Sequence, residues 1–302
     1  MFPKELISRI RKLEITTRRV VNDTLAGQYV SVFRGRGMAF SEVRLYQPGD
    51  EIRTIDWNVS ARMNEPYVKV FTEERELTVM LLVDLSRSQD FGTVDKTKGE
   101  VAAEISAMLA FSAITNNDRV GAVLFTDRIE RYIPPKKGRK HVLALITEIL
   151  ATKPEGRGTD LAGALRFLGN VSRRRTVTFV LSDFLLPAPE GTAGALSWEH
   201  ALRVAARRHD LVPITISDPL ESELAALGIA LVEDPETGAT VRVDLRDAGV
   251  RRRYGKLRAQ TAQARQKLFR KLDLDAVEAE VGGEYVKALV AFFRARARRM
   301  AC

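Results

Sequence analysis

The feature that most constrains the fold is a short apolar stretch, Leu77–Val83, followed at once by Asp84, Ser86 and Ser88. An apolar run of this length without alternation is typical of a strand buried on both faces, as in parallel sheets. Ligands bind at the carboxyl ends of such strands. One carboxylate and two hydroxyls there suit a magnesium-type cation, but the same residues also suit a plain strand end with a helix cap. This segment alone leaves both interpretations open.

The region from Leu77 to about Pro219 alternates strands and helices, which predicts an α/β domain with a mainly parallel sheet. We expect four parallel strands, at Leu77–Val83, Arg119–Phe125, Thr176–Leu181 and Leu211–Ile216. An added antiparallel strand is expected at Arg128–Ile133 and should end at Pro134-Pro135. The expected helices are Lys98–Thr115, Arg139–Leu150, Thr159–Leu168 and Trp198–Arg208.

The flanking segments are less regular. The first part of the chain predicts an amphipathic helix over Lys4–Leu25 and then an irregular segment with a few strands, in which we expect Trp57 to be buried. The tail predicts a β-hairpin around the turn Asp234–Gly238 and two helices, Asp247–Lys271 and Tyr285–Arg299.

Composition excludes several classes of protein. The chain has 302 residues, 45% of them hydrophobic and 29% charged, as soluble globular proteins do. No apolar run approaches the roughly 20 residues that a membrane-spanning helix needs, and the first residues lack the apolar core of a signal peptide. We therefore expect a cytoplasmic protein. The single cysteine, Cys302, excludes an intrachain disulfide and a cysteine metal site.

The net charge of +9 raises the question of nucleic acid binding. Aromatic residues, which would form stacking platforms, are scarce, and no nucleic-acid-binding motif is present. We therefore expect no nucleic acid partner, and attribute the charge to solvated helix faces or to an acidic protein partner. The basic clusters lie in separate segments at residues 136–140, 173–175, 251–258 and 294–299.

Three predicted loops carry the candidate site: Asp84 with Ser86 and Ser88, then Thr159, then Asp183. In type and order these residues resemble the metal-ion-dependent adhesion site of von Willebrand factor type A domains. The resemblance covers about residues 77–219 and implies a von Willebrand type A-like, Rossmann-like α/β fold. It also implies a site for Mg²⁺, or for another divalent cation such as Mn²⁺ or Ca²⁺, held by the five residues.

Further segments resemble the family of the domain of unknown function number 58, in which they precede a type A-like domain. These segments are Glu42–Asp50, Arg53–Trp57 and Ala61-Arg62, and Asp234–Gly238 in the tail also fits. We therefore expect an N-terminal extension (1–75), a type A-like domain (76–219) and a C-terminal hairpin and helices packed on it (220–302). Family members are commonly encoded beside MoxR-type AAA+ ATPases, which implies such an ATPase as the partner.

The resemblance implies a noncatalytic, metal-dependent interaction module, in which an acidic residue of a protein partner completes the shell of the cation. No catalytic residue is predicted, and His141, His200 and His209 are expected to be packed or solvated helix residues. Two alternatives remain open. One is a metal-dependent phosphate hydrolase with Asp84 as its nucleophile, and the other is a metal-free binding scaffold.

Overall fold

The structure is a computed structural model of the chain. It describes residues 10–11, 13–15, 17, 39–72, 76–92, 96–185, 198–222, 224, 228–233 and 240–301. The described residues between 10 and 17 are helical, and the rest of the predicted helix Lys4–Leu25 lies outside the described residues, as does the turn Asp234–Gly238. The chain divides into two compact units, Phe33–Leu77 and the remainder.

The unit Phe33–Leu77 contains an antiparallel pair of strands, β1 (Ala39–Leu45) and β2 (Tyr67–Thr72). Between them lie a 3₁₀ turn, η2 (Ile52–Thr54), and a short helix, α3 (Trp57–Met63), capped by Asp56. The Asp56 carboxylate accepts hydrogen bonds from the backbone N–H groups of Asn58 and Val59, as an N-cap residue does. The prediction that Trp57 is buried is wrong: the residue is 68% exposed, and it lies in a short helix in which no residue is buried.

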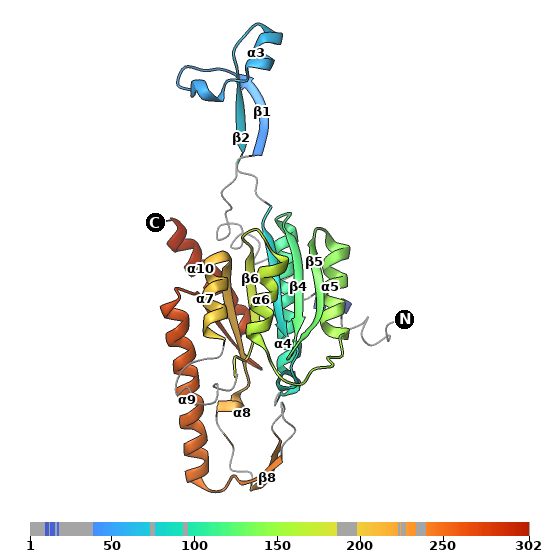
Figure 1. Cartoon of the computed structure of the whole chain (residues 1–302), viewed down its shortest axis with the longest axis vertical. Helices are drawn as coiled ribbons and strands as arrows, with labels where there is room; N and C mark the ends of the chain where they lie inside the picture. Colours follow the sequence, from blue (N-terminus) through green and yellow to red (C-terminus); the bar gives the residue numbers. More distant parts are fainter. Residues whose placement is uncertain are drawn as a thin grey trace. The chain divides into compact units, whose positions relative to one another are not determined.

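The other unit is built on a six-stranded sheet with the order β10-β7-β6-β3-β4-β5, in which only the edge strand β5 is antiparallel (Figure 1). The fold class predicted from the sequence, α/β with a mainly parallel sheet, is confirmed. The strands are β3 (Thr78–Asp84), β4 (Arg119–Phe125), β5 (Ile129–Lys136), β6 (Val177–Ser182), β7 (Asp210–Ser217) and β10 (Val277–Glu280).

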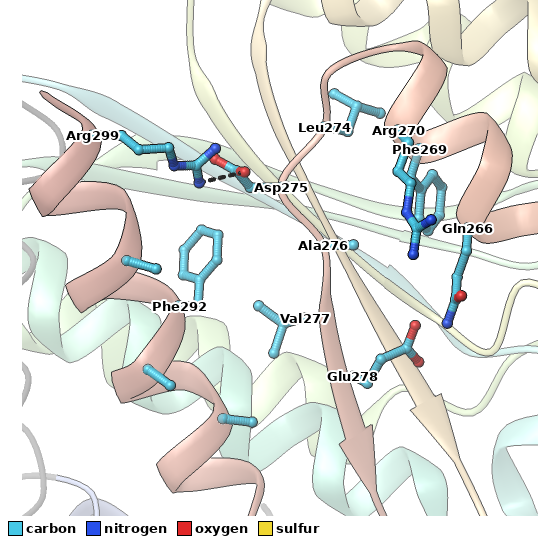
Figure 2. A pocket seen from close by; sticks show the side chains of 13 residues that line it. Gln266, Phe269, Arg270, Leu274, Asp275, Ala276, Val277, Glu278, Phe292 and Arg299 are labelled. Atoms are coloured by element: carbon cyan, nitrogen blue, oxygen red, sulfur yellow. Dashed lines mark hydrogen bonds and ion pairs between the residues drawn. The ribbon is translucent and has the colours of Figure 1, made fainter.

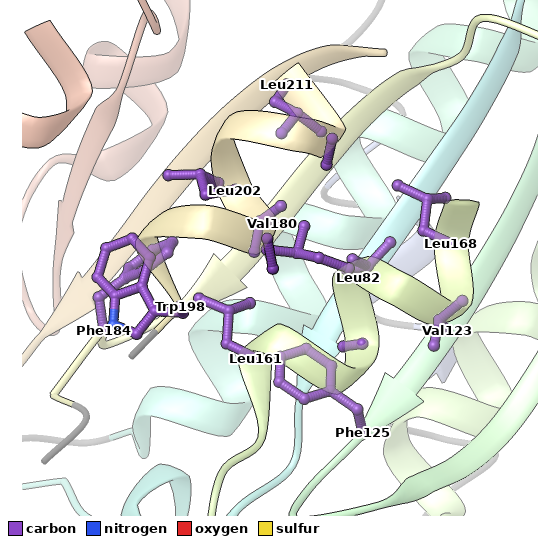
Figure 3. Packing of buried hydrophobic residues seen from close by; sticks show 14 of the residues in the cluster. Leu82, Val123, Phe125, Leu161, Leu168, Val180, Phe184, Trp198, Leu202 and Leu211 are labelled. Carbon is purple, nitrogen blue, oxygen red and sulfur yellow. The ribbon is translucent and has the colours of Figure 1, made fainter. Parts of the chain in front are cut away.

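Helices cover both faces of this sheet, which explains why β3, β4 and β6 are apolar almost throughout. One face packs against α6 (Leu161–Val171) and α7 (Glu199–Arg208), where Leu82, Val123 and Val180 join a single buried cluster (Figure 3). The long helix α4 (Lys98–Thr115) is buried along most of its length and packs against α5 (Arg139–Ala151). All four helices lie close to their predicted bounds.

Strand β5 continues through two prolines that were predicted to end it. The sequence predicted that Pro134-Pro135 end this strand, but β5 continues to Lys136, with an irregular register between the pairs Val120–Lys136 and Ala122–Ile133. An edge strand tolerates proline because one of its sides needs no partner for its N–H groups.

The tail contributes to the same sheet. The hairpin of β8 (Ile229–Glu233) and β9 (Thr240–Asp244), the helix α9 (Ala248–Lys271) and the helix α10 (Tyr285–Ala301) follow the prediction. Strand β10, which lies between the two helices and pairs with β7, was not predicted. Its four residues are too few to show a clear period. The domain boundaries at residues 75/76 and 219/220 stay a prediction.

Candidate functional site

The parallel pairing of β3 with β6 brings the two predicted carboxylates to one edge of the sheet. Val83 pairs with Leu181, so Asp84 and Asp183 follow at the carboxyl ends of neighbouring strands. Ser86 and Ser88 lie in the turn after β3, where the 3₁₀ turn η3 (Arg87–Asp90) begins. This is the place where open α/β sheets bind ligands.

Asp84 is fully buried, and each of its carboxylate oxygens accepts a hydrogen bond. The backbone N–H of Ser86 donates to Oδ1 over 2.8 Å, and the hydroxyl of Ser182 donates to Oδ2 over 2.7 Å. Burial, together with the nearby Asp183 carboxylate, raises the pKa of Asp84 to about 7, against the effect of these hydrogen bonds. A cation at this edge would favour the charged form of Asp84.

A line of hydroxyls connects the two loops. The Ser86 and Ser88 hydroxyl oxygens lie 3.1 Å apart, and the Ser88 hydroxyl donates to Oδ2 of Asp183 over 2.9 Å. Asp183 is almost entirely buried, and its Oδ1 accepts from the backbone N–H of Leu185. Four of the five predicted residues, Asp84, Ser86, Ser88 and Asp183, therefore lie together at one edge of the sheet.

Thr159, the fifth predicted residue, precedes α6 in a loop that two backbone hydrogen bonds hold in place. The N–H of Asp160 donates to the carbonyl of Thr126 at the end of β4, and the N–H of Arg87 donates to the carbonyl of Arg157. The second bond places the Thr159 loop beside the turn that carries Ser86 and Ser88. Thr159 itself is half-buried and stays a predicted ligand.

A residue that the sequence analysis missed lies at the centre of this cluster. Lys98, at the start of α4, is fully buried, and its ammonium donates to Oδ2 of Asp183 over 2.6 Å and to Oε1 of Glu221 over 2.5 Å. Its spacing from Val101, Ala102 and Ile105 places Lys98 on the apolar face of the helix, and this was the available signal. A lysine on a buried face requires an anionic partner.

Lys98 is held in its charged form by these two carboxylates. Burial opposes the charge, but the carboxylates of Asp183 and Glu221 outweigh it and raise the pKa of Lys98 above its ordinary value. The three side chains come from α4, from the residue after β6, and from the short helix α8 (Pro219–Ser222). The candidate site therefore already contains one cationic group.

Two arginines of α9 reach the same cluster from the tail. Arg258 donates through Nε to the carbonyl of Glu221 over 2.9 Å, and its Nη2 lies 3.4 Å from Oε2 of the same residue. Arg265, which is buried, donates to the carbonyl of Asp183 over 3.3 Å. Helix α9 of the tail thus supports the residues that surround Lys98.

The ligand atoms that these residues offer indicate whether a divalent cation fits at the carboxyl ends of β3 and β6. Among the described residues, no three carboxylates, histidines or cysteines are grouped to hold a metal ion, so a cation here would depend on the serine hydroxyls. Hydroxyl and carboxylate oxygens are the ligands that Mg²⁺ prefers, and in that respect the residues fit. A cation that binds Asp183 would lie close to the Lys98 ammonium, which already pairs with that carboxylate and would repel the cation.

The histidines make structural contacts elsewhere. Nε2 of His141 lies 2.8 Å from the carbonyl of Val120, and Nδ1 of the buried His209 lies 3.0 Å from the Thr176 hydroxyl. His200 is exposed on α7. The prediction that they are packed or solvated residues agrees with these positions.

Some of the basic residues in the predicted clusters neutralise acidic residues of the same chain. Besides Arg258, Arg296 of α10 pairs with Asp210 at the start of β7, and Arg299 pairs with Asp275. The positive charge of the tail is therefore used in part to attach α9 and α10.

A separate pocket of about 600 Å³ lies among α9, β10 and α10 and contains none of the five predicted site residues (Figure 2). Apolar side chains such as Phe269, Val277 and Phe292 line it, and the Asp275–Arg299 ion pair lies at its edge. Polar side chains also line it, among them Gln266, Arg270 and Glu278.

No helix in the described part of the chain combines the length and the apolar character needed to cross a bilayer.

Among relatives, the uncharacterized protein Rv1480 of Mycobacterium tuberculosis (strain ATCC 25618 / H37Rv) is 34% identical over 236 residues, which cover 78% of this chain and 72% of that protein. The uncharacterized protein YeaD of Bacillus subtilis (strain 168) is 31% identical over 102 residues, covering 33% of this chain and 23% of that protein.

Solved structures similar to this chain include a conserved hypothetical protein, BatB, from Bacteroides thetaiotaomicron, at 15% identity and a TM-score of 0.47, covering 74% of this chain and 99% of that one. They also include a von Willebrand factor type A protein from Catenulispora acidiphila, at 15% identity and a TM-score of 0.42, covering 78% and 44%. Residues 42–265 match the family described as "Protein of unknown function DUF58". The chain therefore belongs to the DUF58 family, as its motifs predicted.

Proposed function

We propose that this chain is a noncatalytic protein-interaction module, and that its binding edge lies at the carboxyl ends of β3 and β6. The observation that supports this is the continuous polar line from Asp84 through Ser86 and Ser88 to Asp183. The same residues carry the resemblance to the metal-ion-dependent adhesion site. Most of the line is buried, so it is built into the sheet and is not an incidental surface cluster.

We further propose that the interaction depends on a divalent cation, with Mg²⁺ as the first candidate and Mn²⁺ or Ca²⁺ as alternatives. Ser86, Ser88, Thr159 and Asp183 would supply oxygen ligands, and Asp84 would supply negative charge. With only two carboxylates at the site, the cation would stay electron-poor and attract an acidic side chain of a partner. Asp84 and Ser182 would keep the turn in position.

The proposed partner is a MoxR-type AAA+ ATPase that presents an Asp or Glu residue, with this chain as its adaptor in the cytoplasm. This part of the proposal rests on the family, whose members are commonly encoded beside such ATPases. The chemistry required of the partner is more general, because any exposed carboxylate on a complementary surface would satisfy it.

One alternative, the metal-free binding scaffold, is favoured by a specific observation. The Lys98 ammonium pairs with both Asp183 and Glu221, and Arg258 pairs with Glu221 as well, so both carboxylates have cationic partners without a metal ion. The hydrolase alternative is less compatible with the geometry. Asp84 is fully buried and both of its oxygens accept hydrogen bonds, which leaves its carboxylate poorly placed to attack a phosphate.

The test measures binding of the purified full chain to the MoxR-type ATPase of the same organism, with Mg²⁺ and with EDTA. We expect EDTA and Asp84→Asn each to weaken binding by at least about tenfold, or 1.4 kcal/mol. Asparagine keeps the size of the side chain and one acceptor, so the fold should survive. Asp90→Asn, at an exposed position of the same turn, is the matched control.

Binding that resists both EDTA and Asp84→Asn would favour the metal-free scaffold. Phosphatase and ATPase assays of the chain alone with Mg²⁺ examine the hydrolase alternative. Turnover that is lost in Asp84→Asn and kept in Asp90→Asn would contradict a noncatalytic role.

A further inference from the structure

Lys98 occupies a position that is unfavourable for a cation in two respects. It is the first residue of α4, where the partial positive charge of the helix N-terminus repels an ammonium group. It is also fully buried, which removes its hydration. The carboxylates of Asp183 and Glu221, at 2.6 Å and 2.5 Å, compensate for these costs. The arrangement therefore depends on the same Asp183 that is the predicted metal ligand.

We propose that the Lys98 ammonium is a built-in cation of this site that competes with a divalent metal ion for Asp183. The inference deepens the proposed function and rests on it, because it concerns the same five-residue site. It assigns to Lys98 the role of a positioning residue that sets how tightly the site binds metal.

One oxygen atom of the Asp183 carboxylate already has two hydrogen-bond donors. Oδ2 of Asp183 accepts from both the Lys98 ammonium and the Ser88 hydroxyl. A carboxylate oxygen has about two lone-pair positions, so a cation that binds Oδ2 must displace one of the two donors.

Of the two donors, Ser88 can stay and Lys98 cannot. The Ser88 hydroxyl can keep donating to Oδ2 while it presents a lone pair of its own oxygen to a cation, since a hydroxyl is both donor and acceptor. The Lys98 ammonium has no lone pair, and its charge repels a divalent cation at short range. Lys98 must therefore give up Asp183 when a metal ion binds.

The displaced ammonium keeps one carboxylate partner, Glu221. Glu221 remains as its second carboxylate, held in place by Arg258 and by the backbone of α8. Metal binding would thus transfer the lysine from a position shared by two carboxylates to Glu221 alone. The metal affinity of the site should depend on both Lys98 and Glu221, in opposite directions.

The test is isothermal titration calorimetry of the full chain with MgCl₂, repeated with MnCl₂. We expect Lys98→Met, which keeps the apolar stem and removes the charge, to bind Mg²⁺ at least about tenfold more tightly than the parent chain. We expect Glu221→Gln to bind at least about threefold more weakly, because the displaced lysine then lacks a carboxylate. Lys96→Met is the matched control, since Lys96 pairs with Glu104 instead.

Thermal unfolding provides a second readout that does not depend on a partner. Lys98→Met should unfold at a lower temperature than the parent chain without metal, and Mg²⁺ should restore much of the loss, because a ligand that binds the native state stabilises it. A purely structural role for Lys98 predicts the same loss without metal but no gain in affinity and no such recovery.

The outcomes separate this inference from the proposed function. Equal Mg²⁺ affinity in the parent chain and in Lys98→Met, or tighter binding in Glu221→Gln, would overturn the competition and leave metal dependence standing. Tight binding in Lys98→Met with none in the parent chain would support the competition and contradict metal dependence of the natural protein. No binding in either would overturn both.

Discussion

Two aspartate–cation pairs in this protein have comparable distances but different surroundings. At the carboxyl edge of the central sheet, Asp183 lies 2.6 Å from the Lys98 ammonium, and the side chains are 4% and 0% exposed. After the β8–β9 hairpin, Asp244 binds Arg246 through two hydrogen bonds of 3.0 Å, with side chains 44% and 66% exposed. Water solvates the second pair whether or not it forms, whereas the first pair has no such alternative.

The same contrast separates the apolar residues of the two regions. Leu82 in β3 is fully buried between helices, whereas Leu231 in β8 is 76% exposed although it is also in a strand. The comparison indicates that residue type and contact distance do not by themselves tell where the stability of this protein resides. Burial decides how much each group contributes to stability, because a buried group cannot be solvated by water whereas an exposed one can.

The largest expected effect is that of breaking the buried ion pair. Lys98→Met leaves Asp183 without its cation in a buried site, which should reduce the free energy of unfolding by about 3–5 kcal/mol. Chemical denaturation without divalent metal measures the loss. Arg246→Met breaks the exposed pair and should leave the midpoint unchanged. Equal losses in the two variants would show that burial does not separate the pairs.

A somewhat smaller loss is expected from the matched pair of leucines. Leu82→Ala removes buried methyl groups and leaves a cavity in the central sheet, which should cost about 2–5 kcal/mol. Leu231→Ala should change the free energy of unfolding by no more than about 0.5 kcal/mol, because its side chain is already in water. A loss above about 2 kcal/mol in Leu231→Ala would mean that the hairpin is covered in solution.

The smallest effect concerns a single proton in the central sheet. Burial lowers the pKa of His209, and Arg208 and Arg175 lower it further. The unfolded chain therefore takes up this proton first, near pH 6.5, so the contribution of His209 to stability falls as the pH drops below that value, whereas the raised pKa of Asp84 makes its contribution rise over the same range. The change in the denaturation midpoint between pH 8 and pH 5.5 is therefore compared between variants. This change should be less destabilising in His209→Gln than in the parent chain and the same in His200→Gln, whose parent side chain is exposed; the same change in all three chains would exclude a contribution of His209.

Much of the fold could be predicted because its information is local. The apolar runs that became β3, β4 and β6 and the helical periods of α4 and α9 depend on residues close together in the sequence. The exceptions have non-local causes. Strand β10 forms because β7 offers it a free edge, and Trp57 lies on a short helix in which no residue is buried.

The sequence by itself determined which residues stand at the carboxyl ends of β3 and β6, because a buried parallel strand must end where its apolar run ends. Together with the resemblance to the metal-ion-dependent adhesion site, this placement predicted that Asp84, Ser86, Ser88, Thr159 and Asp183 would meet, and Asp84, Ser86, Ser88 and Asp183 lie together in the structure. Only the tertiary structure decided that Lys98 joins them, since its partners lie 85 and 123 residues further along the chain. The physical reason is that a buried charge is stabilised by whichever opposite charges the fold brings within contact distance, and this has no local signature beyond a lysine on an apolar face.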